Sequence, residues 1–131
     1  MSTSLPQKPF VYIVDDQEAV LRTLTIALGR HFRVEVQSNS ERAVDEILRK
    51  SPDVVILDIK MPNRDGLWVL RQIRSQKLKV PIILNSAYQD TVLPADLQGI
   101  YAPFGIVTKN GNLTQLKEMI TQAVQSVLGI R

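Results

Sequence analysis

The sequence predicts an α/β domain in which helices cover both faces of a parallel β-sheet. Short hydrophobic runs alternate along the 131-residue chain with segments whose apolar residues recur at helical spacing. Runs that are apolar throughout are typical of strands buried on both faces of a parallel sheet. Each of the main runs is also followed by a polar residue that could serve at a phosphoryl-transfer site. These runs occupy residues 10–14, 54–57, 82–84 and 105–107.

The first half of the chain predicts two helices separated by a short strand. Apolar residues at positions 20, 21, 24, 26, 27 and 28 recur at helical spacing, and Gly29 favours a helix end near Arg30. Residues 33–36, RVEV, predict the second strand. Ser40 should begin a second helix, which Pro52 stops. The apolar face of that helix should consist of Ala43, Val44, Ile47 and Leu48.

The third predicted helix follows the loop KMPNRDG at residues 60–66. Its helical spacing directs Arg71 and Arg74 towards water. Pro81 stands at the start of the fourth strand, where proline is allowed. The apolar face of the helix should consist of Leu67, Leu70 and Ile73.

The segment at 88–103 is expected to be irregular. Pro94 falls inside the only plausible helix there, and Gly99 ends it. A closing helix follows the fifth strand, with Asn112 as its expected N-cap. The apolar stripe of that helix should consist of Leu113, Leu116, Ile120, Ala123, Val124 and Leu128.

The composition limits the class of protein. A chain of this length with 44% hydrophobic residues can bury one core, so we expect a single domain at 10–131 after a flexible segment at 1–9. The absence of cysteine excludes disulfides and thiolate metal sites. No apolar run approaches the roughly 20 residues that cross a bilayer, and no signal peptide is evident, so we expect a cytoplasmic protein without a membrane partner. The formal charge of +3 is scattered, which argues against direct nucleic-acid binding by this domain.

Three aspartates should meet at the carboxyl ends of neighbouring strands. Asp15 and Asp16 follow the first run and Asp58 follows the third. One acid of the pair could cap the next helix, which leaves the other unexplained. Gathered like charges are costly unless a cation lies among them, and oxygen ligands without histidine or cysteine favour Mg²⁺ or Mn²⁺. We therefore expect a metal site at these acids, with simple capping as the alternative.

The same strand ends carry residues suited to phosphoryl transfer. Beside a cation, the Asp58 carboxylate can attack phosphorus and form an acyl phosphate, although aspartate here would also suit a turn. Lys109 could bind a phosphoryl oxygen with its ammonium group, or could simply lie in solvent. Ser86 could donate its hydroxyl to a phosphoryl oxygen.

With these residues, the chain resembles the receiver domains of two-component response regulators. The matching pieces are VDD at 14–16, LDIKMPNRDG at 57–66, SA at 86–87 and TK at 108–109, and the resemblance covers about residues 10–128. It implies a flavodoxin-like, doubly wound (βα)5 fold. In that fold five helices surround a five-stranded parallel sheet of order 2-1-3-4-5.

The resemblance also implies a phosphorylation-controlled signalling switch. Asp58 would accept a phosphoryl group from the phosphohistidine of a sensor histidine kinase or a histidine phosphotransfer protein. Lys109 and Ser86 would rearrange around the new charge, and the affinity for a downstream effector domain or protein would change. A homodimer is a further assembly left open. Such a domain catalyses its own phosphorylation and dephosphorylation and turns over no metabolite.

The implied cofactor is Mg²⁺. The resemblance assigns it to Asp16, Asp58 and the backbone carbonyl of Lys60, with Asp15 acting through water. A related aspartyl-phosphate hydrolase is a further hypothesis, and Lys60 argues against it because it stands where such an enzyme would carry a second acid.

Several positions depart from the family pattern. Asn110 stands where proline usually follows the lysine, and Ile106 stands where an aromatic ring usually swings inward on activation. These departures support an alternative, a pseudo-receiver that acts as an interaction module without phosphorylation. Lys60 and Tyr88 flank the expected path of the hydrolytic water, which predicts a long-lived phosphoryl group unless both side chains point into solvent.

Overall fold

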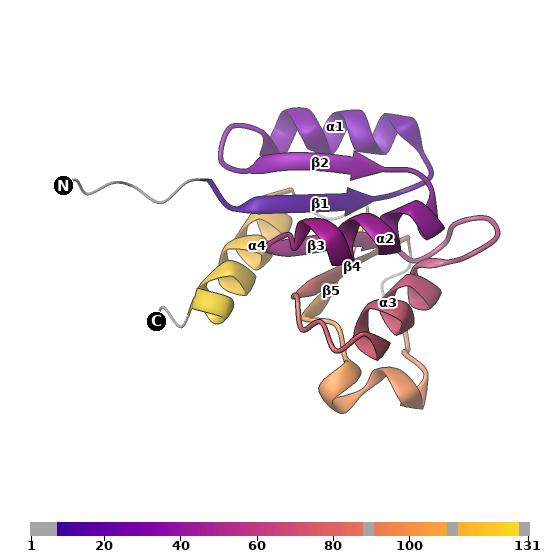
Figure 1. Cartoon of the computed structure of the whole chain (residues 1–131). Helices are drawn as coiled ribbons and strands as arrows, with labels where there is room; N and C mark the ends of the chain where they lie inside the picture. Colours follow the sequence, from indigo (N-terminus) through magenta and orange to yellow (C-terminus); the bar gives the residue numbers. More distant parts are fainter. Residues whose placement is uncertain (1–7, 88–90, 110–112, 129–131) are drawn as a thin grey trace.

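The sheet has the predicted architecture in the computed structural model, which describes residues 8–87, 91–109 and 113–128. Its strands are parallel and lie in the order β2-β1-β3-β4-β5 (Figure 1), which confirms the predicted α/β class and flavodoxin-like strand order. The strands are β1 (Phe10–Val14), β2 (Arg33–Gln37), β3 (Val54–Asp58), β4 (Ile82–Ser86) and β5 (Gly105–Thr108).

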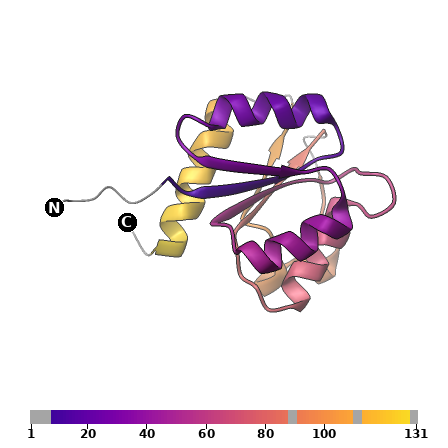
Figure 2. The ribbon, with the colours of Figure 1, turned by 45° about the horizontal axis from the view of Figure 1, so that its top comes forward.

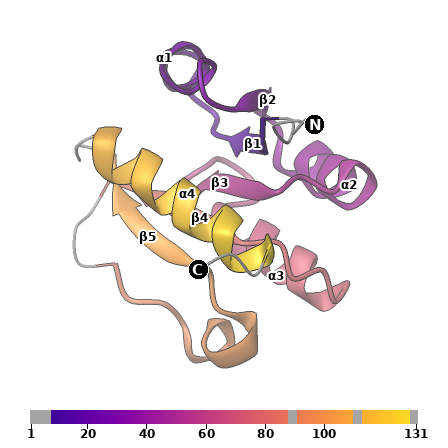
Figure 3. The same ribbon diagram turned by 90° about the vertical axis from the view of Figure 1, so that its left-hand side faces the viewer.

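Helices cover both faces of the sheet (Figures 2 and 3). The helices are α1 (Glu18–Leu28), α2 (Ser40–Lys50), α3 (Gly66–Ser75) and α4 (Leu113–Leu128). Helices α1 and α4 pack on one face, and α2 and α3 pack on the other. Successive strand residues point to opposite faces. Val11 and Ile13 therefore lie in the core beneath α1 and α4, whereas Tyr12 and Val14 lie in the core beneath α2 and α3. This double burial explains why the central strands are continuous apolar runs.

Helix α2 begins where predicted, and the side chain of Asn39 accepts a hydrogen bond from the backbone N–H of Arg42 (2.9 Å). Ala43 and Ile47 are buried as expected. Leu48 is exposed, so its predicted place on the apolar face is wrong. The reason is geometric, because each residue turns the helix by about 100° and Leu48 follows the most buried position.

Helix α4 matches the predicted apolar stripe only in its middle. Leu113, at its start, is exposed. The expected N-cap, Asn112, and the side chain of Leu128 lie outside the described residues. The buried residues of this helix are Leu116, Ile120 and Ala123.

Arg74 of α3 does not face water, and that expectation is wrong: the residue is only 8% exposed. Its guanidinium donates hydrogen bonds to the carbonyl oxygens of Leu78 (3.0 Å), Val80 (2.9 Å) and Ala102 (3.2 Å). Burial lowers the pKa of Arg74 below its ordinary value. One side chain therefore ties the end of α3 to the entry of β4 and to the segment before β5.

We expect Arg74→Ala to lower the free energy of unfolding by about 2 to 4 kcal/mol, because carbonyl groups in a buried environment would lose a charged donor. Urea denaturation measures this change. The matched control is Arg71→Ala, since Arg71 is exposed and pairs with Asp96 (2.7 Å) at the surface, where such pairs contribute about 0 to 1 kcal/mol. Equal losses in the two variants would contradict the role given to Arg74.

The connection between β4 and β5 is irregular in its described part, residues 91–104, as predicted. It contains the 3₁₀ turns η1 (Ala95–Leu97) and η2 (Gly99–Tyr101) and no α-helix in that range. The resemblance implies a fifth helix here, so the described chain departs from that expectation. Pro94 is extended (φ −57°, ψ 155°) and Gly99 is left-handed (φ 66°), and both conformations interrupt a helix.

Candidate functional site

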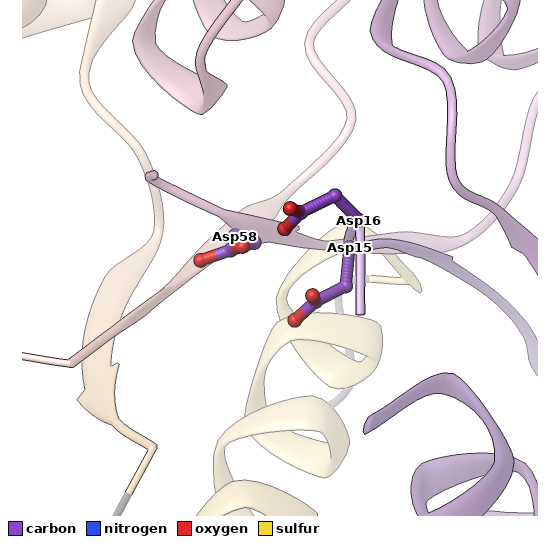
Figure 4. Close-up of side chains that lie close together, drawn as sticks. All are labelled: Asp15, Asp16 and Asp58. Carbon is purple, nitrogen blue, oxygen red and sulfur yellow. The ribbon is translucent and has the colours of Figure 1, made fainter. Parts of the chain in front are cut away.

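The carboxyl ends of β1 and β3 bring the three predicted acids together. These strands are neighbours, and Val14 pairs in register with Leu57, so Asp15 and Asp58 follow at the same edge. Figure 4 shows Asp15, Asp16 and Asp58 clustered there. Each offers a carboxylate oxygen, and these oxygens all lie within 4.8 Å of one another. The three acids therefore lie close together, as predicted.

The backbone explains the placement of Asp15 but not that of Asp16. The N–H of Asp15 donates to the carbonyl of Gln37 (3.2 Å), and its Oδ1 accepts from the N–H of Gln17 (2.9 Å). Asp15 is 2% exposed, whereas Asp16 is more exposed. Gln17 holds the N-cap position of α1. Capping therefore does not account for Asp16.

Lys109 reaches the acids instead of lying in solvent. Its Nζ lies 3.0 Å from Oδ2 of Asp15 and 3.1 Å from Oδ1 of Asp58. Its backbone N–H donates to the carbonyl of Ser86 (2.7 Å), which fixes the end of β5 beside β4. Burial alone would lower the pKa of Lys109, but hydrogen bonds to Asp15 and Asp58 outweigh burial and raise it. The lysine is therefore charged at neutral pH.

The surroundings of Asp58 disfavour its ionised form. Burial, and then the negative charge of Asp15, raise the pKa of Asp58 to about 6, and Lys109 offsets only part of the rise. Its Oδ2 is buried and has no hydrogen-bond partner among the described residues. A buried carboxylate oxygen without a partner is costly, and one lysine leaves the three acids with a net negative charge. Both observations fit a bound divalent cation of the hard, oxygen-binding class.

We expect the unfavourable burial of ionised Asp58 to make the stability of chelator-treated protein depend on pH. The pKa of Asp58 is raised on folding, so the folded state binds the extra proton and stability falls as pH rises from about 4, where unfolded aspartate titrates, to about 6. Asp58→Asn should remove this fall. The measurement is the free energy of unfolding of both proteins across that range. A constant difference between them would contradict the raised pKa.

Ser86 lies at the end of β4 and is buried. Its hydroxyl lies 2.7 Å from the hydroxyl of Thr91, and either group could donate. Ser86 thus lies on the strand next to Asp58, as predicted, but its recorded side-chain partner belongs to the segment after β4. Sequence reasoning missed Thr91 and the buried Asn85, which pairs in register with Asp58. The polar end of an otherwise apolar strand was the only available indication of Asn85.

The loop after β3 folds back tightly on the strand end. The N–H of Gly66 donates to the carbonyl of Ile59 (2.8 Å), and a Cβ built at Gly66 would lie 2.1 Å from the carbonyl oxygen of Asp58. The Ser40 hydroxyl anchors the loop by donating to the carbonyl of Arg64 (2.5 Å). Only glycine fits at the contact with Asp58.

The remaining predicted positions are only partly described. Lys60 is exposed. Ile106 is partly buried against the core beneath α2 and α3, so it is a packing residue. Tyr88 and Asn110 lie outside the described residues.

Fold and site together define a doubly wound α/β domain with a cluster of three aspartates and a lysine paired to two of them at its strand ends. Residues 11–121 match the family model of the response regulator receiver domain. The chain belongs to this family. None of the helices in the described part of the chain combines the length and the apolar composition that a membrane-spanning helix needs.

Known proteins agree with this assignment. The chain is 32% identical over 116 residues to the regulatory protein AtoC of Escherichia coli, covering 88% of this chain and 25% of AtoC. It is 35% identical over 78 residues to the transcriptional regulatory protein PhoP of Bacillus subtilis, covering 59% of this chain and 32% of PhoP. The chain therefore spans a third or less of these relatives. The receiver domain of the Francisella response regulator 1452 superposes with a TM-score of 0.80 at 21% identity, covering 92% of this chain and 99% of that chain.

Proposed function

We propose that this receiver domain, at residues 10–131, is a phosphorylation-controlled switch in a two-component or phosphorelay system. Asp58 accepts the phosphoryl group from a phosphohistidine of a sensor histidine kinase or histidine phosphotransfer protein. The observation that carries the proposal is the Asp58 carboxylate: Lys109 holds Oδ1, and Oδ2 is buried beside two further acids without a hydrogen-bond partner among the described residues.

The transfer step balances without a further reactant. A carboxylate oxygen of Asp58 forms a bond to phosphorus while the phosphorus–nitrogen bond of the phosphoimidazole breaks. The leaving imidazole takes up a proton and returns to the neutral form. The product is an acyl phosphate, and the domain turns over no metabolite.

Asp15, Asp16 and Asp58 would hold Mg²⁺, with the backbone carbonyl of Lys60 as a further proposed ligand. Bound Mg²⁺ supplies positive charge that neutralises the acids and the phosphoryl oxygens. The ammonium of Lys109 lies between two carboxylates and can turn to a phosphoryl oxygen once Asp58 is modified. Ser86 would follow by exchanging Thr91 for a phosphoryl oxygen.

The output is a change in affinity for a downstream effector domain or protein in the cytoplasm. The names of the relatives AtoC and PhoP support a regulatory output, and their greater length supports an effector beyond the receiver. A homodimer is another form that the output could take. A pseudo-receiver is the second candidate, and the partly buried Ile106 favours it because it offers no ring to move.

The test is the intact mass of the protein after incubation with acetyl phosphate, with Mg²⁺ in one sample and a chelator in the other. The proposal expects a gain of one phosphoryl group that requires Mg²⁺. Folding is checked by circular dichroism. A folded protein that gains no mass in either sample would favour the pseudo-receiver.

A further inference from the structure

A groove lies at the end of the sheet that is opposite the acidic site. It has a volume of about 620 Å³ and lies at the amino ends of β4 and β5. The connection after α3 (75–81), the segment 100–104 and the last turns of α4 surround it. Figure 3 shows the end of α4 beside the start of β5. The volume is within the range of about 300 to 1,000 Å³ that is typical of binding pockets.

Large apolar side chains line this groove while remaining open to solvent. They are Ile100, Tyr101, Phe104 and Val127, and Ile100 is 86% exposed. They come from two parts of the chain that are distant in sequence. Single exposed apolar residues are ordinary, whereas a group of them around one hollow marks an interaction surface. Aromatic residues are also the side chains that most often anchor a protein partner.

The charge of the groove is positive. Lys77 and Lys79 line it, and none of the lining residues that the structure describes is acidic. Among the described residues, the side-chain ammonium group of neither lysine makes a hydrogen bond or an ion pair. Arg74 adds a further cation at the groove wall, where carbonyl groups hold it. A ligand with carboxylates next to apolar side chains would complement this surface.

We propose that the groove binds an acidic amphipathic segment of a partner protein. Its apolar side chains would pack on Ile100, Tyr101 and Phe104, and its carboxylates would pair with Lys77 and Lys79. The groove differs from the phosphoacceptor site in position and in charge. We therefore expect it to bind the segment without phosphorylation of Asp58.

A second copy of the chain fits the groove less well. A second apolar patch of the described surface lies on α1 and β2 and includes Ile26 and Val36. Glu18 in that patch already pairs with Arg22 (3.8 Å), so the patch offers no net negative charge. Charge complementarity therefore favours an acidic partner over self-association.

The test uses two synthetic helical peptides with leucines at identical positions, one with glutamates at the other exposed positions and one with lysines there. Fluorescence anisotropy measures affinity, and amide NMR shifts locate the peptide. We expect the acidic peptide to bind at least about tenfold more tightly, a difference of roughly 1.4 kcal/mol. Its shifts should cluster at residues 77–81 and 100–104.

Substitutions with matched controls show which residues of the groove contribute to peptide affinity. Ile100→Ser, and separately Lys77→Glu with Lys79→Glu, should each weaken the acidic peptide by about tenfold or more, as expected for anchor residues. Ile26→Ser, at a residue 79% exposed on α1, and Arg30→Glu with Arg42→Glu, which change charge equally, should have no such effect. Every changed residue is exposed, so folding should persist, and circular dichroism checks it.

Three results would overturn the proposal. The first is equal or absent binding of the two peptides. The second is a set of NMR shifts centred on α1. The third is sedimentation showing that the protein alone forms a dimer that Ile100→Ser dissolves, because a second copy would then occupy the groove.

Discussion

Replacing Asp58 with asparagine is expected to leave the protein folded and to abolish its uptake of a phosphoryl group. Asparagine has nearly the same shape, but its amide is neutral and is a poor nucleophile towards phosphorus. Lys109 keeps Asp15 as a partner, so the strand ends should hold their arrangement. Intact mass against time, with acetyl phosphate and Mg²⁺, measures the loss.

The control is Asp45→Asn, which makes the same change of charge at an exposed position on α2. It should be phosphorylated as fast as the unaltered protein. Asp58→Asn should also raise stability at neutral pH without Mg²⁺, because it removes a buried charge whose pKa is raised to about 6. A folded Asp58→Asn protein that gains the phosphoryl group at the original rate would contradict the assignment.

Alanine at Gly66 is expected to cause the largest loss of stability of any single methyl addition discussed for this chain. The new Cβ would lie 2.1 Å from the carbonyl oxygen of Asp58 and 2.9 Å from the Cα of Ile59. Both neighbours are backbone atoms, so no side chain can turn away. We expect a loss of about 3 kcal/mol or more, at the upper end for an overpacked site, measured by urea denaturation.

Gly99→Ala separates this steric clash from backbone strain. Gly99 has a left-handed φ of 66° and nothing within 4 Å of a built Cβ, so alanine there should cost only about 1 to 2 kcal/mol. Gly66→Ala should also slow phosphorylation, because relief of the clash must move the loop beside Asp58. If the two alanine variants lose equal stability, the close approach at Gly66 is not as tight as described.

The sheet and the acid cluster could be predicted because each depends on local pattern and one general rule. Apolar runs buried on both faces indicate parallel strands, and the carboxyl ends of such strands share an edge. That rule places Asp15 beside Asp58 without knowledge of any side-chain contact. The position of Lys109 at the end of β5 follows from the same rule.

Other features depend on partners that are distant in sequence. Helical spacing places Arg74 near the polar side of α3, but the carbonyls of Val80 and Ala102 hold its guanidinium inside. The Thr91 partner of Ser86 belongs to an irregular segment without periodicity. The groove combines residues 75–81 and 100–104 with the last turns of α4, which are distant in sequence, so no single stretch of sequence indicates it.

The decisive measurement is the position of the modified residue. Borohydride reduces an aspartyl phosphate to homoserine, which tandem mass spectrometry can place in the sequence. After treatment with acetyl phosphate and Mg²⁺, we predict homoserine at position 58, with Asp15 and Asp16 unchanged and no homoserine in the chelator-treated sample. Homoserine at another position, or equal modification without Mg²⁺, would contradict the assignment of Asp58 as the Mg²⁺-assisted phosphoacceptor.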